Sequence, residues 1–151
     1  VAGAVAVVGF DGHIKGVLKA LDSLNYQGNI ISTTTATLPS VKSIKESEGI
    51  HVTAPAIYNE NFVFVDRVKK EYRNRYNKPF TQYSANGYDL LHIVAGLLED
   101  KPVTRESLKA ILAKGFVHSG VFGSIELKAG QRDIIFPIFP AQIINGQVVY
   151  K

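Results

Sequence analysis

Residues 4–37 decide the fold, and they read AVAVVGFDGHIKGVLKALDSLNYQGNIISTTTAT. The first five are small and apolar throughout, which predicts a strand covered on both faces, as in a parallel sheet. Apolar residues then recur at helical spacing from Ile14 to Leu24. Gly28 is expected to end this helix in the left-handed conformation, and residues 29–31 predict a second strand. The stretch is therefore a strand–helix–strand unit.

Both strands of this unit end in residues suited to ligand contact. A parallel crossover is right-handed almost without exception, so the segments after the two strands emerge at one edge of the sheet, where open α/β sheets bind ligands. The first carries Phe10, which could stack on a flat ligand or, alternatively, belong to the core. The second carries four hydroxyl side chains, Ser32–Thr35, which suit hydrogen bonding to a ligand. The alternative is a local turn that caps the next helix.

The remaining pattern runs from sheet to helices and back to sheet. We expect a short helix at 39–45, a strand from Ile50 closed by Pro55, helices at 65–76, 84–98 and 104–112, a strand at 121–127, and strands at 134–144 and 147–150 joined by an Asn145-Gly146 hairpin turn. Segments 1–57 and 134–151 are expected to form one lobe, with 60–132 inserted. This insert brings one candidate strand for three apolar helices, so we expect part of their surface to lack cover.

Composition narrows the function classes. The chain has 151 residues, 46% of them hydrophobic and 20% charged, which is typical of a globular domain. Its net charge of +4 is spread along the chain, so nucleic acid is not an expected partner. The sequence contains no cysteine, and its four histidines lack metal-binding spacing, so no metal is expected. The sequence contains neither a phosphate-binding loop nor a nucleophile elbow. We therefore expect no bound cofactor and no catalytic activity. With no membrane span or signal segment, and Val1 as its first residue, the chain is expected to be a processed product or a fragment.

Several landmarks, taken in order, resemble one protein family. They are VAVVGF at 5–10, NIISTT at 29–34, EGIHVTAP at 48–55, the helix at 64–76 followed by KPFTQYSANGYD at 78–89, and GVFG at 120–123. Together they resemble the branched-chain-amino-acid type of periplasmic binding protein, the solute receptors of ABC importers. The resemblance covers nearly the whole chain.

The resemblance implies a fold and an incomplete chain. Members of this family have the type I periplasmic-binding-protein fold, an α/β architecture of two doubly wound lobes with parallel sheets, joined by hinge crossings. The match implies the C-terminal portion only: 1–57 and 134–151 would belong to the second lobe and 60–132 to the first. Hinge crossings would lie near Ala56–Asn59 and Asp133–Phe136. The uncovered helices would pack on the absent first-lobe sheet, or would favour a homodimer of the fragment.

The resemblance also implies ligand-binding residues. The aromatic residue after the first strand, here Phe10, would face the ligand, with Asp11 and Tyr58 at the rim. Thr34 and Thr35 would form hydrogen bonds from the loop after the second strand. Amino-acid receptors of the family place a carboxylate in that loop to hold the ligand's ammonium, where this chain has Thr34. An uncharged or acidic, aromatic solute is therefore expected rather than a standard amino acid.

The implied function is solute capture for a membrane permease of an ABC transporter, in the periplasm or outside the cell and without catalysis. Within transport, the resemblance points to the receptors for amino acids. One alternative is a ligand-sensing regulatory module of the same fold. A second is a small flavodoxin-like enzyme that uses a nucleotide or flavin.

Overall fold

The computed structural model describes residues 3–59 and 61–151. The chain divides into two compact units: unit 1 is Val1–Asn59 with Ile138–Lys151, and unit 2 is Glu60–Pro137. The assignment of these units to the two lobes of a larger protein remains a proposal. Within the described ranges, no helix is both long and apolar enough to cross a membrane.

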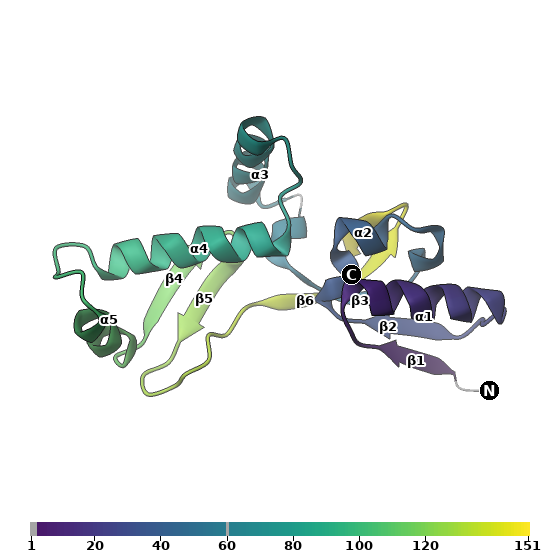
Figure 1. Cartoon of the computed structure of the whole chain (residues 1–151), viewed down its shortest axis with the longest axis horizontal. Helices are drawn as coiled ribbons and strands as arrows, with labels where there is room; N and C mark the ends of the chain where they lie inside the picture. Colours follow the sequence, from purple (N-terminus) through teal and green to yellow (C-terminus); the bar gives the residue numbers. More distant parts are fainter. Residues whose placement is uncertain (1–2, 60) are drawn as a thin grey trace. The chain divides into compact units, whose positions relative to one another are not determined.

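Unit 1 is a mixed α/β layer (Figure 1). Its elements are β1 (Ala4–Val7), α1 (Asp11–Ser23), β2 (Asn29–Ser32), η1 (Thr34–Thr37), α2 (Pro39–Lys42), η2 (Lys45–Ser47), β3 (His51–Pro55), η3 (Ala56–Tyr58), β6 (Ile138–Ile144) and β7 (Gln147–Tyr150), where η marks a 3₁₀ helix. The strands form one sheet in the order β1-β2-β3-β6-β7. The first three are parallel, and β6 and β7 join antiparallel. This confirms the α/β class and the parallel strand–helix–strand unit.

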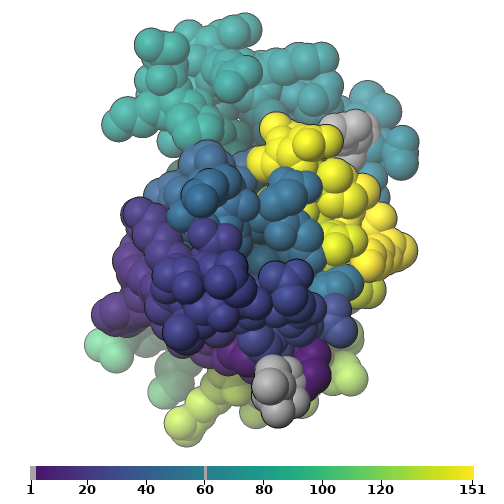
Figure 2. All heavy atoms as spheres, turned by 90° about the vertical axis from the view of Figure 1, so that its right-hand side faces the viewer, coloured from purple at the N-terminus to yellow at the C-terminus, as the bar shows by residue number. Residues whose placement is uncertain are grey.

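The core of unit 1 lies between one sheet face and the helices α1 and α2. Its buried cluster comprises Val7, Ile14, Leu18, Ala36, Val41, Ile50, Val52, Ala54, Ala141, Ile143 and Val148. Ile14 and Leu18 of α1 are a helical turn apart, so one stripe of the helix is buried. In Figure 2 the C-terminal residues, in yellow, lie against the blue part of unit 1. The carboxylate of Glu48, which precedes β3, accepts from the backbone N–H of Asn145 in the β6–β7 turn at 2.9 Å.

The opposite face of this sheet is open. Ala4 and Ala6 of β1 are exposed, and Ile31 of β2 is 47% exposed. The expectation that both faces of the first strand are covered is therefore wrong within unit 1, because the described helices that form its core pack on one side only. A hollow of about 620 Å³ lies over this region, lined among others by Ile31, Thr53 and Pro140.

Left-handed residues close the turns of unit 1. The expected left-handed exit at Gly28 is wrong, because Asn25 takes that conformation with φ 51°. A Cβ added at Gly28 would collide with the Tyr26 hydroxyl and come close to the carbonyl oxygen of Gly3, so a larger residue there requires the Tyr26 side chain to move. The Asn145-Gly146 hairpin is confirmed. Both residues have positive φ, 50° and 69°, as a two-residue turn between twisted strands requires.

Unit 2 is a helical layer with a β-hairpin. Its elements are α3 (Val63–Tyr76), α4 (Gln82–Leu97), α5 (Arg105–Leu112), β4 (Phe116–Gly120) and β5 (Gly123–Leu127). The predicted helices are confirmed, and the Thr104 side chain caps α5 by accepting from the N–H of Ser107 at 3.1 Å. The strand expected at 121–127 is confirmed as β5, but it begins at Gly123, because Val121 and Phe122 form the turn of a hairpin. The partner strand β4 of this hairpin was not predicted.

The C-terminal sheet is shorter than expected at its start. The prediction of a strand from residue 134 is wrong, because β6 begins at Ile138. Ile135 instead makes an isolated bridge with Glu126 of β5. Pro137 lies between the two pairings and has no N–H to donate to either.

Helix α4 runs along the hairpin of unit 2 (Figure 1), and its Asp89 fixes the hairpin turn. Asp89 is 1% exposed, and its carboxylate accepts from the N–H groups of Val121 at 2.9 Å and Phe122 at 3.2 Å. Away from this contact, Leu90 and Leu91 are 56% and 73% exposed. The uncovered apolar surface predicted for the insert is therefore present on α4.

Candidate functional site

The carboxyl ends of β1, β2 and β3 form the candidate site in unit 1. Ser32, the last residue of β2, is buried, and its Oγ donates to the carbonyl oxygen of Val7 at the end of β1 over 2.8 Å. This bond holds the two strand ends together, so the segments that follow them start from a fixed edge. Open α/β sheets bind ligands at this edge.

Thr34 and Thr35 of the hydroxyl run begin the 3₁₀ turn η1, and side chains of this turn form hydrogen bonds. Oγ1 of Thr34 lies 3.2 Å from Oγ1 of Thr53 on β3, and Oγ1 of Thr37 donates to the Thr34 carbonyl over 2.6 Å. Thr33 precedes the turn and makes no capping bond through its side chain, and Leu38, which precedes α2, makes none. The run therefore does not serve as a helix cap, and Thr34 and Thr35 remain half-buried at the edge.

Tyr58 is tied to the same turn. Its Oη lies 3.2 Å from Oγ1 of Thr37, which is fully buried. The ammonium of Lys42 lies 5.7 Å from the centre of the Tyr58 ring, within range of a cation–π interaction. Thr34 and Tyr58, 24 positions apart in the sequence numbering, are thus brought together through Thr37.

Phe10 and Asp11 lie at the end of β1. Phe10 is 76% exposed, so it is not the core aromatic of the alternative interpretation. The Asp11 carboxylate accepts from the N–H of Gly12 at 2.8 Å and from Oγ of Ser40 at 3.1 Å. The bond from Gly12, and then the bond from Ser40, hold the pKa of Asp11 below its ordinary value.

Replacing Ser40 with alanine tests the second of these bonds. We expect Ser40→Ala to raise the pKa of Asp11 toward its ordinary value, because one donor to the charged form is lost while Gly12 remains. The carboxyl carbon of Asp11, followed by NMR across a pH titration, reports the change. Ser43→Ala is the control, because Oγ of Ser43 donates to the carbonyl of Pro39 instead. An unchanged Asp11 titration in Ser40→Ala would show that the Ser40 bond does not form.

All five residues predicted for the site lie at this edge or next to it, but ligand contact by any of them stays a prediction. The sequence interpretation missed Thr37, Thr53 and Ser40. Thr37 continues the hydroxyl run and could have been included on that ground. Thr53 and Ser40 carry no local signal, since their partners are 19 and 29 positions away.

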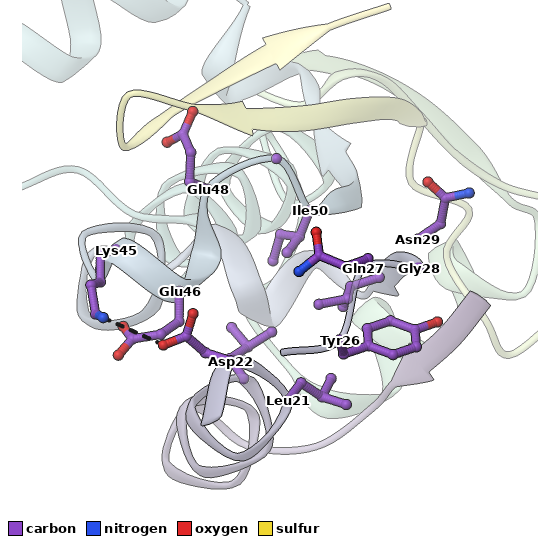
Figure 3. A pocket seen from close by; sticks show the side chains of 13 residues that line it. Leu21, Asp22, Tyr26, Gln27, Gly28, Asn29, Lys45, Glu46, Glu48 and Ile50 are labelled. Carbon is purple, nitrogen blue, oxygen red and sulfur yellow. Dashed lines mark hydrogen bonds and ion pairs between the residues drawn. The ribbon is translucent and has the colours of Figure 1, made fainter. Parts of the chain in front are cut away.

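A second hollow lies at the opposite, amino-terminal edge of the sheet (Figure 3). Its volume is about 310 Å³, and residues from the end of α1, the 26–30 segment and the 45–50 segment line it. Its charged side chains are largely engaged with neighbours. Lys45 pairs with Asp22 at 3.4 Å, and Glu48 accepts from the N–H of Asn145. Over the described residues, no three His, Asp or Glu side chains gather as a metal site would require.

Comparison with known proteins identifies the fold. The sequence matches no protein family and no curated protein. A solved structure of a leucine-binding protein from Thermotoga maritima superimposes with a TM-score of 0.82 at 21% identity, over 99% of this chain and 43% of that chain. The fold is that of the type I periplasmic binding proteins.

Other structures with the type I fold give the same result. A substrate-binding protein of a branched-chain amino acid transporter from Streptococcus pneumoniae, solved with isoleucine, has a TM-score of 0.80 at 17% identity. The match covers 97% of this chain and 42% of that chain. A solute-binding protein of an ABC transporter from Rhodopseudomonas palustris, solved with 3,4-dihydroxybenzoic acid, has a TM-score of 0.78 at 18% identity. The match covers 98% of this chain and 43% of that chain. The structural neighbours are thus ABC-transporter solute-binding proteins, and the present chain spans less than half of the length of each of these three.

Proposed function

We propose that this chain is part of a solute-binding protein that captures a small organic molecule for an ABC importer. One observation carries the proposal: an exposed aromatic ring and a hydroxyl turn stand at the carboxyl edge of a sheet whose fold is that of solute receptors. Unit 1 would supply one wall of the ligand cleft. The segments at the border between the units, near residues 59 and 138, would act as hinges for closure.

The ligand class follows from the groups at the edge. Thr34 and Thr35 offer neutral donors and acceptors, and the Asp11 carboxylate is already bonded to Gly12 and Ser40. A buried ammonium without a carboxylate partner would cost several kcal/mol. A carboxylic acid without an amino group, with a flat apolar part for Phe10, therefore fits better than an α-amino acid.

Partners and location follow from the same proposal. The closed, loaded form would be recognised by a membrane permease, in the periplasm or outside the cell. Closure requires that the solute bind the closed form more tightly than the open one. The homodimer expected from the sequence has no support among these observations.

A thermal-shift screen of the full-length protein tests the ligand class. Benzoate and 3,4-dihydroxybenzoate are expected to raise the melting temperature, because a ligand present at 100 times its Kd stabilises the folded state by about 2.7 kcal/mol. Leucine and isoleucine are expected to have less effect. Larger shifts with the two amino acids than with the two aromatic acids would contradict the assignment.

A pair of variants tests whether Thr34 takes part. Thr34→Val keeps the shape of the side chain and removes its hydroxyl, so we expect binding of the best acid to weaken about tenfold, the value of roughly one hydrogen bond. Ser43→Ala removes a hydroxyl that is bonded to the carbonyl of Pro39, and it should bind as the parent protein does. Equal affinity in both variants, measured by calorimetry, would place the ligand away from Thr34.

A further inference from the structure

A chain of hydroxyl contacts runs through unit 1 from the candidate ligand turn to the segment where the chain leaves the unit. The turn η1 ends at Thr37, whose Oγ1 is fully buried and lies 2.6 Å from the carbonyl oxygen of Thr34. The same Oγ1 lies 3.2 Å from Oη of Tyr58, the last residue of η3. Asn59, the next residue, is the border of the unit.

The exit segment is held from its other side as well. The hydroxyl of Tyr150 on β7 donates to the carbonyl of Pro55, the residue that precedes η3. Burial raises the pKa of Tyr150 above its ordinary value, so this phenol stays protonated and keeps its donor. Within η3, the N–H of Asn59 donates to the carbonyl of Ala56 over 2.9 Å. The Thr37–Tyr58 contact therefore joins a well-anchored exit segment to η1, alongside the Thr34–Thr53 contact between η1 and β3.

We propose that Thr37 is a positioning residue whose buried hydroxyl couples the order of the ligand turn to that of the exit segment. The inference rests on the proposed function in so far as Thr34 and Thr35 contact solute. A solute that orders η1 would then also order η3 and thereby favour one conformation of the segment that leads out of unit 1. Such coupling is reciprocal by thermodynamic linkage, so each end must respond to a change at the other.

Amide hydrogen exchange of the unliganded protein tests the coupling from the Thr37 end. Thr37→Val keeps the branched shape and removes the hydroxyl. We expect exchange of the Asn59 amide to become about fivefold faster or more, because the hydrogen bond between the Thr37 hydroxyl and Oη of Tyr58 is lost, while the longer one from Oη of Tyr58 to the backbone carbonyl of Thr37, at 3.5 Å, remains. Thr37→Ser keeps the hydroxyl and is expected to restore the parent rate. An effect of Thr37→Val that is confined to the amides of Ala36 and Leu38 would overturn the proposal.

Ser47→Ala is a matched control within the same unit. Ser47 also ends a 3₁₀ turn, is 1% exposed, and donates through Oγ to the carbonyl three residues earlier, Ile44, over 2.7 Å. Its removal should speed exchange of the neighbouring Glu48 amide, which donates to the carbonyl of Lys45, and leave Asn59 unchanged. A change at Asn59 of the same size as in Thr37→Val would show general loosening of unit 1 and would overturn the proposal.

A variant at the other end of the contact, Tyr58→Phe, tests the coupling if Thr37→Val folds poorly. Tyr58→Phe removes only the phenolic oxygen, and we expect faster exchange at the amide of Leu38, which donates to the carbonyl of Thr35 over 3.2 Å. An unchanged Leu38 amide would overturn the proposal. None of these measurements uses a ligand, so the coupling can fail while the proposed function stands, and the solute screen can fail while the coupling stands.

Discussion

Asp89→Ala is expected to destabilise unit 2 by about 3 kcal/mol or more. The carboxylate is buried and accepts two backbone hydrogen bonds, from Val121 and Phe122, and hydrogen bonds to charged groups contribute about 1.5–3 kcal/mol each. Its removal also leaves two N–H groups of a buried turn without a partner. Urea unfolding, followed by circular dichroism, measures the loss.

Two further variants separate the charge from the shape. Asp89→Asn keeps one acceptor oxygen in place and is expected to lose about half as much stability as the alanine variant. Asp66→Asn is the surface control, because Asp66 is paired at 2.7 Å with Lys70 in an exposed i,i+4 pair on α3, and such exposed pairs contribute little to stability. Similar losses for Asp89→Asn and Asp66→Asn would contradict the role assigned to Asp89.

Gly115→Ala is expected to cost about 3 kcal/mol or more, whereas Gly130→Ala should cost about 1 kcal/mol. Both glycines have φ +75°, in the left-handed region that a residue with a side chain rarely adopts, so both substitutions strain the backbone. The two positions differ in the room that they leave for a Cβ atom. A Cβ at Gly115 would meet the carbonyl oxygen of Leu127 and the backbone nitrogen of Ala129. At Gly130, none of the described residues would have an atom within 4 Å of it.

The comparison between the two glycines isolates the effect of crowding. The neighbours of Gly115 are backbone atoms at the end of β5, which cannot rotate away as a side chain can. Differential scanning calorimetry of the two variants gives the difference directly. Equal melting temperatures for Gly115→Ala and Gly130→Ala would mean that backbone strain, and not the approach of β5, requires glycine after α5.

Features set by neighbouring residues were open to prediction. The helices of unit 2 follow from apolar residues at helical spacing, and the cap of α5 follows from Thr104 standing just before that pattern. The Asn145-Gly146 turn was predicted on the same basis, because these two residue types tolerate positive φ. Strand β4 was missed because FVHSG lacks an apolar run, and it forms through its pairing with β5.

In the candidate site, too, features set by neighbouring residues could be predicted and those set by distant residues could not. Its place at the carboxyl edge follows from the right-handed parallel crossover, which residues 4–37 specify alone. The partners of its residues do not: Asp11 meets Ser40, Thr34 meets Thr53, and Thr37 meets Tyr58. These pairs are 19 to 29 positions apart, and no periodic signal connects them.

The sequence by itself determined the α/β class and the parallel unit that begins the chain, because periodicity and turn chemistry act over a few residues. The resemblance to solute receptors came separately, from landmark segments that match in order. Only the tertiary structure decided that the sheet of unit 1 is covered on one face, that Asp89 holds a hairpin turn and that Thr37 joins η1 to the exit segment. Burial and long-range hydrogen bonds are properties of the packed chain, since they depend on which distant segments the fold brings within a few ångströms.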